Sequence, residues 1–215
     1  MSMILKKCAI VHVPKTGGTW IRRSLKKAYG PIIFIPERNK YSHPPLEMMQ
    51  KLYPDMPKFT IAFVRNPLTW WQSYWTFRVE TTWGDKVRKT RQKQGRFCAH
   101  PIIQKTSELD AKCKHGDFNA FMYNVLKYYP GHCSNLYEIY IGTPKDQVSY
   151  VGRFENLVDD TVTALNVAGE NFEESKLRKV GKQRFGKYKK SVEYDPDLKK
   201  KVIQAESKAI HRFGY

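Results

Sequence analysis

The sequence is poor in cysteine, in acidic residues and in long apolar runs. Four cysteines among 215 residues are too few for a disulfide scaffold, so a hydrophobic core has to hold the fold together. No apolar run approaches the roughly 18 residues that a membrane-spanning helix needs. The apolar part of the N-terminus is also too short for a signal peptide. We therefore expect a cytoplasmic protein without a membrane span.

The shortage of acidic residues leaves a strongly basic chain. Twenty acidic residues stand against 38 basic ones, which gives a formal net charge of +18. Such a surface attracts polyanions, including nucleic acids, phosphorylated nucleotides and acidic glycans, and charge alone does not choose among them. The basic residues gather in segments 86–96 and 176–190, which we expect to flank a site.

Residues that could bind a metal are present, but their spacing is not typical of a metal site. Cys98 and His100 are followed by Cys113 and His115, and zinc accepts both residue types. The paired Cys-x-x-Cys spacing of zinc sites is absent. We therefore expect no bound metal.

Apolar runs alternate with amphipathic patterns along the chain. The runs predict strands at Cys8–Val13, Ile32–Ile35, Thr60–Val64, Tyr137–Ile141 and Val148–Phe154. The amphipathic patterns predict helices at Thr19–Tyr29, Leu46–Tyr53, Thr69–Glu80, Phe118–Tyr129 (capped by Asp117), Glu155–Ala168 and Pro196–Phe213. This alternation predicts an α/β fold with one domain over residues 1–215, and a parallel sheet flanked by helices. Residues 81–116 lack a clear period and predict a mobile insertion or lid.

The most informative segment lies between the first predicted strand and the first predicted helix. It reads His12-Val13-Pro14-Lys15-Thr16-Gly17-Gly18-Thr19-Trp20. Two glycines let the backbone wrap closely around a ligand, with successive N–H groups pointing at it. The positive end of the following helix and the ammonium group of Lys15 add charge at the same place. An ordinary turn also favours glycine, but this composition indicates a binding site for an anion such as a phosphate group.

The order of residues in this segment differs from the Walker A motif of P-loop kinases. In that motif the lysine follows the last glycine, whereas Lys15 precedes both glycines. The segment instead resembles the 5′-phosphosulfate-binding loop of sulfotransferases that use PAPS (3′-phosphoadenosine 5′-phosphosulfate). Its Pro-Lys-Thr-Gly-Gly-Thr form is especially similar to that of the carbohydrate, or Golgi-type, members.

A second motif begins at the end of the third predicted strand. It consists of Phe63-Val64-Arg65-Asn66-Pro67, followed by a helical segment that carries Ser73 and Tyr74. Arginine supplies a forked pair of donors and serine supplies a hydroxyl, so the two can converge on one phosphate. The motif looks like the family's 3′-phosphate-binding element, in which Arg-(Asp/Asn)-Pro precedes a helix with Ser-x-Tyr. Segments 151–157, 194–196 and 212–215 resemble the family more weakly.

The resemblance implies a P-loop-like nucleotide-binding fold and a transferase that uses PAPS and releases PAP (3′-phosphoadenosine 5′-phosphate) without a metal. The residues it implies for nucleotide binding are Lys15, Thr16, Gly17, Gly18, Thr19, Trp20, Arg65 and Ser73. The family also closes over the nucleotide with a basic loop near the C-terminus. Arg178, Lys182 and Arg184 lie in the corresponding region, although they cannot be matched one by one.

Sulfuryl transfer needs a base that takes the proton of the acceptor. Lys15 would stabilise the leaving group, and the candidate base is His43, in a loop where many family members carry a catalytic histidine. The ordinary pKa of imidazole lies near neutral pH, which suits the task. Other family members use glutamate, so Glu37 and Glu47 remain alternatives.

The resemblance to the carbohydrate enzymes points to a glycan or another hydroxyl or amine compound as the acceptor. It also leaves open that the chain is the lumenal part of a Golgi enzyme. Two other classes of protein stay open as well, namely a P-loop kinase and a basic nucleic-acid-binding protein, although we expect no nucleic-acid partner. The tryptophans Trp70, Trp71, Trp75 and Trp83 could either stack on sugars or fill the core.

Overall fold

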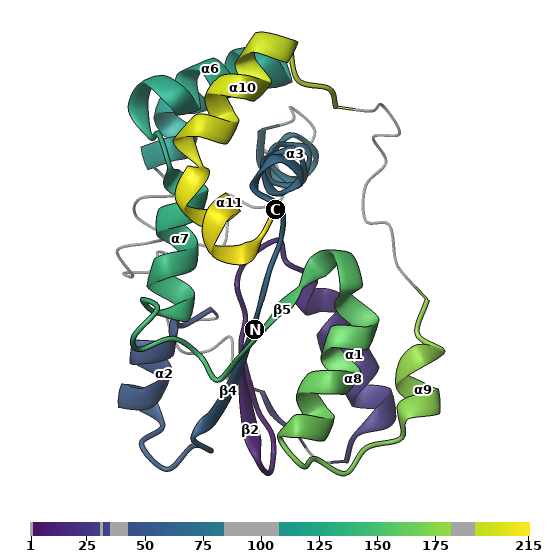
Figure 1. Ribbon diagram of the computed structural model, residues 1–215. Helices are drawn as coiled ribbons and strands as arrows, with labels where there is room; N and C mark the ends of the chain where they lie inside the picture. The colour runs from purple at the N-terminus through teal and green to yellow at the C-terminus, as the bar shows by residue number, and fades with distance from the viewer. Residues whose placement is uncertain (1, 31, 35–42, 84–107, 182–191) are drawn as a thin grey trace, which may run out of the picture. The chain divides into compact units, whose positions relative to one another are not determined.

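The computed structural model describes residues 2–30, 32–34, 43–83, 108–181 and 192–215 (Figure 1). These residues confirm an α/β fold with an open sheet flanked by helices. By their contacts they form two compact units. The first unit runs to Arg65 and resumes at Tyr137, and the second runs from Asn66 to Leu136 and includes the C-terminal helices.

The first unit contains a five-stranded sheet in the order β3-β1-β2-β4-β5. Its strands are β1 (Met3–Ile4), β2 (Cys8–Val11), β3 (Ile33–Phe34), β4 (Phe59–Val64) and β5 (Tyr150–Arg153). β2, β4 and β5 run parallel, with Ile61 opposite Ile10 on one side and Tyr150 on the other. β1 is antiparallel to β2, because the short turn 5–7 leaves no room for a crossover, and it is also antiparallel to β3. The sheet is therefore mixed, and the prediction of a parallel sheet holds for three strands only.

Three helices cover one face of this sheet. They are α1 (Gly18–Ala28), α8 (Leu157–Val167) and α9 (Glu174–Arg178), and the 3₁₀ turn η2 (Phe154–Asn156) leads from β5 into α8. Alternate residues of β2 and β4 point to one face, and there they share a buried core with Leu25, Leu165 and Leu177 of the three helices. Figure 1 shows α2 (Leu46–Leu52) on the other side of the sheet.

The start of β2 is held by a buried carboxylate. Glu170, which is 8% exposed, accepts hydrogen bonds from the main-chain N–H groups of Lys7 and Cys8 and from the hydroxyl of Tyr29. These donors satisfy a charge that would be costly to bury alone. These hydrogen bonds therefore fix the start of β2, the strand that leads into the Lys15 segment.

The segment 137–141 forms a helix, so the prediction of a strand there is wrong. It belongs to α7 (His132–Ile141), whose buried residues Leu136, Tyr137, Tyr140 and Ile141 repeat at helical spacing. A short apolar run rich in tyrosine and isoleucine reads equally well as a strand. The buried residues of this segment follow the helical period.

The second unit is built around an aromatic core. Its helices are α3 (Pro67–Arg78), the π-helical turn η1 (Val79–Trp83), α6 (Phe118–Tyr128), the first half of α7, α10 (Pro196–Ala205) and α11 (Ser207–Phe213). Trp70, Trp71 and Trp75 are buried, and the ring of Trp83 lies 5.6 Å from that of Phe121. Trp70, Trp71 and Trp75 therefore fill the core, whereas Trp83 is half-buried and packs against it.

The predicted helix 196–213 is broken at Glu206, where α10 ends and α11 begins. The Glu206 carboxylate is 2% exposed and accepts hydrogen bonds from the Ser134 amide at 2.8 Å, the Ser134 hydroxyl at 2.7 Å and the Trp71 indole at 3.1 Å. It thus binds the first amides of α7, where a helix favours negative charge. No proline or glycine stands at this break, and the residue there, Glu206, is held by hydrogen bonds to α7 and Trp71.

Both ends of the predicted lid 81–116 are helical: residues 81–83 belong to η1, and a helical turn begins at residue 108. Residues 108–113 are helical, and Asp110 ties them to α3 through an ion pair with Arg78 at 2.9 Å and a hydrogen bond from Tyr74 at 2.7 Å. Asp117 caps α6 as predicted, because its carboxylate accepts from the Ala120 amide. Residues 84–107 of the predicted lid lie outside the described residues.

No helix within the described ranges has the length and apolar character that crossing a membrane requires.

Candidate functional site

The segment between β2 and α1 is a tight loop with two residues in the left-handed region. Lys15 has a φ of 68° and Gly17 a φ of 92°. The hydroxyl of the buried Thr16 donates to the main-chain carbonyl of Val13 at 2.9 Å and so closes the loop from inside. The amide of Trp20 already donates to the Gly17 carbonyl at 2.8 Å, so the helix begins directly after the loop. The predicted order of strand, loop and helix is confirmed.

The conformation of Lys15 is costly for a residue with a side chain. Within the described ranges it is the one non-glycine residue with a positive φ. Such a conformation costs on the order of 1 kcal/mol or more, and it persists where the surrounding structure imposes it. Because glycine would adopt it without strain, the lysine side chain itself is the reason to look for a function at this position.

The two glycines of the loop are required for different reasons. Gly17 needs its left-handed backbone, and a Cβ atom there would lie 2.5 Å from a methyl group of Leu157. Gly18 has no positive φ, but a Cβ atom there would lie 2.0 Å from Nε2 of His12. The sequence suggested that both glycines make room for a ligand. At Gly18 the structure shows that the missing side chain makes room for the His12 imidazole.

The first turn of α1 carries the partial positive charge of a helix N-terminus. Two predicted nucleotide-binding residues, Thr19 and Trp20, lie in this turn and differ in exposure. The turn contains no acidic residue, and Thr19 is exposed. Trp20 is buried, and its indole N–H donates to the carbonyl of Val180 at 2.8 Å. Trp20 therefore packs in the core and anchors the chain that follows α9.

Arg65 follows β4 and reaches the loop that follows the neighbouring parallel strand β2. Its Nη1 atom lies 3.5 Å from the main-chain carbonyl of Lys15, and its guanidinium lies 4.2 Å above the centre of the Phe154 ring. The main chain of Arg65 is held by Tyr137, whose hydroxyl donates to its carbonyl at 2.6 Å and accepts from its amide at 3.1 Å. That Phe154 and Tyr137 contact Arg65 was not predictable from the sequence, because both contacts join distant segments.

The geometry concentrates positive charge at the carboxyl ends of β2 and β4. Lys15, Arg65 and the amide end of α1 meet at one loop. Arginine that stacks on an aromatic ring keeps its donors in a fixed plane, which suits the oxygens of a phosphate or sulfate group. The main-chain N–H groups at a helix N-terminus also favour the binding of such an anion. The arrangement is chemically suited to hold an anion with several oxygens.

His43 lies beside this loop, against His12. The two rings meet edge to face, with 4.4 Å between their centres and 79° between their planes. The hydroxyl of the fully buried Ser2 accepts from the His12 amide at 3.1 Å and donates to the carbonyl of Pro44 at 3.5 Å. It therefore links the main chain at His12 to the main chain just after His43. Burial lowers the pKa of His43 to about 3, and it also lowers the pKa of His12. The expected near-neutral pKa is not found, and His43 is neutral at physiological pH.

The other predicted residues are distributed over the two units. Ser73 lies on α3 in the second unit. Arg178 is paired with Asp159 at 2.6 Å and with Glu174 at 2.7 Å, so its charge is already balanced. Glu47 is exposed and pairs with Lys51 at 2.6 Å, which holds its pKa below the usual range. Glu37, Lys182 and Arg184 lie outside the described residues.

The residues considered for metal binding show no site in the part of the chain that is described. No group of three or more His, Cys, Asp and Glu side chains lies together there. Burial raises the pKa of the Cys113 thiol to about 11, and Nδ1 of His115 accepts a hydrogen bond from the Asp117 amide. Cys98 and His100 lie outside the described residues.

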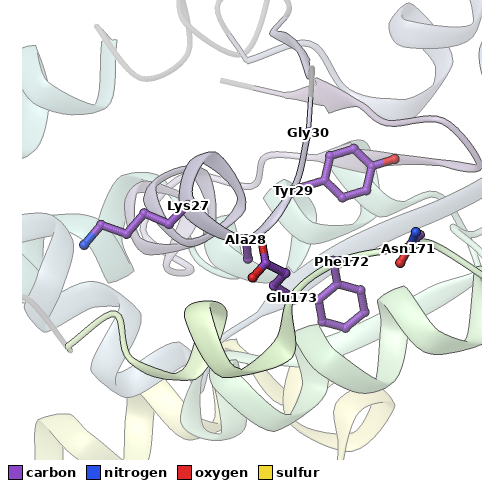
Figure 2. A pocket seen from close by; sticks show the side chains of 7 residues that line it. All are labelled: Lys27, Ala28, Tyr29, Gly30, Asn171, Phe172 and Glu173. Carbon is purple, nitrogen blue, oxygen red and sulfur yellow. The ribbon is translucent and has the colours of Figure 1, made fainter.

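A hollow of about 310 Å³ lies at the opposite end of α1 from the loop. It is lined by the last residues of α1, by Tyr29 and Gly30, and by residues 171–173 (Figure 2). The amide of Glu173 donates to the carbonyl of Ala28 there, and Figure 2 shows the Glu173 carboxylate near that end of the helix. The C-terminal end of a helix carries partial negative charge. This hollow is therefore not suited to the anion that the loop can bind.

Comparison of the chain with protein-family models gave no match. Comparisons with curated proteins and with solved structures gave no match either.

Proposed function

We propose that the protein is a sulfotransferase that moves the sulfuryl group of PAPS to an acceptor hydroxyl or amine, with a glycan as the preferred acceptor class. One observation carries the proposal: Lys15 stands in a left-handed conformation two residues before Gly17, in the loop that leads into α1. This is the place that the sulfotransferase loop gives to its lysine. Thr16, Gly17, Gly18 and Thr19 complete a loop whose composition matches it.

The contacts of Arg65 support a nucleotide with two anionic groups. Lys15 and the first amides of α1 would bind the 5′-phosphosulfate, and Arg65 would bind the 3′-phosphate. The ring of Phe154 beneath the guanidinium and the Tyr137 hydroxyl on its main chain hold Arg65 before any ligand arrives. Such preorganisation lowers the cost of binding.

The reaction itself needs charge stabilisation and proton transfer. The acceptor oxygen bonds to sulfur while the bond from sulfur to the bridging oxygen of PAPS breaks, and PAP leaves with both electrons of that bond. Lys15 neutralises the charge that develops on the leaving oxygen. His43, neutral in the free protein, takes the acceptor proton. A pKa of about 3 makes it a weak base, so the negative charge of bound PAPS has to raise that pKa for the step to proceed.

Two features speak against the alternatives. The strand β4 is followed by Arg65 and Asn66, where a P-loop kinase would need a carboxylate for Mg²⁺. Trp70, Trp71 and Trp75, which could have formed a stacking surface for nucleic acid, are buried in the core of the second unit.

The proposal is tested by incubating the protein with ³⁵S-labelled PAPS and a panel of acidic glycans, simple sugars and amines. We expect label on at least one acceptor, release of an equal amount of PAP, and no transfer by the folded variant Lys15→Ala. Transfer of the γ-phosphate of ATP in place of the sulfuryl group would contradict the proposal.

A further inference from the structure

The ring of His12 lies between two parts of the candidate site that are far apart in sequence. Nε2 of His12 occupies the space next to Gly18, where a Cβ atom would come within 2.0 Å of it. On another side, the ring meets that of His43 edge to face at 4.4 Å. His12 follows directly after Val11, the last residue of β2, and its amide donates to the Ser2 hydroxyl. It is therefore a rigid spacer between the start of α1 and His43.

Three contacts that do not involve the His12 ring hold the loop. Thr16 closes it by the hydrogen bond to Val13, and the side chain of Leu157 packs against Gly17. Arg65 contacts the carbonyl of Lys15 from β4. These three contacts lie on the side of Lys15 and Gly17, whereas the His12 ring touches Gly18. Removing the ring should therefore leave anion binding by the loop largely intact and should release His43.

We propose that His12 is a positioning residue, which sets the place of the His43 ring relative to the first amides of α1. The proposal rests on the proposed function in one respect, that His43 is the base. A base that is misplaced by about 1 Å loses much of its rate advantage, while the affinity for the donor is unchanged. In this role His12 touches neither the donor nor the acceptor, and the glycine at position 18 exists to admit its ring.

The packing is tested first by stability, without any substrate. Gly18→Ala should lower the melting temperature of the wild-type protein, because the new methyl group collides with His12. In the His12→Ala background the same substitution should raise the melting temperature, because alanine favours a helix more than glycine does. Gly30→Ala is the matched control, since nothing lies within 4 Å of a Cβ atom there, and its effect should be equal in both backgrounds. If Gly18→Ala had the same effect in both backgrounds, the proposed packing would be wrong.

The effect on His43 is tested by NMR of the imidazole nitrogens, again without substrate. In the wild-type protein the His43 ring should remain neutral at pH 5.5. In His12→Ala water can reach the ring, so its pKa should rise and a protonated fraction should appear at pH 5.5. His12→Gln, which keeps most of the volume, should restore the neutral ring. An unchanged His43 signal in folded His12→Ala would overturn the proposal whether or not PAPS is the donor.

The last step compares kcat with donor affinity once an acceptor is known. His12→Ala should lower kcat at least tenfold and change the Kd for PAP less than threefold, and His12→Gln should recover part of kcat. An unchanged kcat together with an altered His43 signal would reduce His12 to a packing residue and so contradict the positioning role. If wild-type protein transfers no label from PAPS, the proposed function fails, while the stability and NMR results still decide whether His12 fixes His43.

Discussion

The hydroxyl of Tyr137 satisfies both main-chain polar groups of Arg65, donating to its carbonyl at 2.6 Å and accepting from its amide at 3.1 Å. Tyr137 is fully buried, so no water replaces the hydroxyl when it is removed. Tyr137→Phe should therefore lower the free energy of unfolding by about 1–3 kcal/mol, the usual cost of unpaired buried groups. Urea unfolding measures this, with Tyr128→Phe, at an exposed tyrosine, as the control. A loss no larger than that of the control would show that the bridge is not important for stability.

Removal of the Arg65 side chain should discriminate between two donors. Arg65→Ala should weaken binding of PAPS much more than binding of adenosine 5′-phosphosulfate, which lacks the 3′-phosphate, because that phosphate loses a fork of donors. Arg65→Lys should be nearly as weak, since lysine offers neither the fork nor the stacking on Phe154. Competition binding with both nucleotides gives the comparison. Equal losses for the two donors would instead assign Arg65 to the 5′ group, near the Lys15 carbonyl that it contacts.

The half-buried histidines His12 and His43 should make the fold sensitive to acid. Burial lowers the pKa of His43 from 6.5 to about 3 and lowers that of His12 as well. Because the pKa of His43 is lower in the folded than in the unfolded protein, protons bind preferentially to the unfolded state as the pH falls below about 6.5. The folded state is therefore most stable, as far as this histidine is concerned, above about pH 6.5, and it loses this stability as the pH falls toward 3. We expect the unfolding free energy to fall by up to about 1.4 kcal/mol per pH unit for each histidine. His43→Gln should show a shallower slope between pH 6.5 and 4.5, and an identical slope would contradict the assignment.

The carboxylate of Glu206 should be essential to the second unit. Glu206→Gln keeps the shape but places an amide N–H₂ group against N–H donors of Trp71, Cys133 and Ser134. We expect a loss of about 1.5–3 kcal/mol in unfolding free energy, as for hydrogen bonds to a charged group. Glu193→Gln, at an exposed position, is the control and should change little. A loss within the range of the control would mean that the charge is not needed.

Local chemistry made parts of the structure predictable from sequence. The cap at Asp117, the strand β4 and the glycine-rich loop before α1 each depend on neighbouring residues, and all three are found where the sequence placed them. The left-handed conformation of Lys15 was not predictable, because only glycine adopts it without strain.

Contacts between distant segments escaped prediction. The stacking of Arg65 on Phe154 and the wedge of His12 against Gly18 depend on how the sheet and helices pack, and no sequence pattern carries that information. The segment 137–141 was predicted as a strand because a five-residue segment with four apolar or aromatic side chains does not distinguish the period of a strand from that of a helix. The lowered pKa of His43 likewise follows from burial, which the loop sequence does not reveal.

The central claim is that Lys15 and its loop bind a 5′-phosphosulfate nucleotide, and calorimetric titration of PAP into wild-type protein and Lys15→Gly tests it most directly. Glycine accepts the left-handed conformation of Lys15, so this variant should be as stable as the wild type or slightly more stable, and a loss of binding cannot be blamed on unfolding. We predict micromolar or tighter binding of PAP to the wild type, binding at least a hundredfold weaker to Lys15→Gly, and no binding of ATP–Mg²⁺ to either. Equal PAP affinity of the two proteins, or binding of ATP–Mg²⁺ without PAP, would contradict the account.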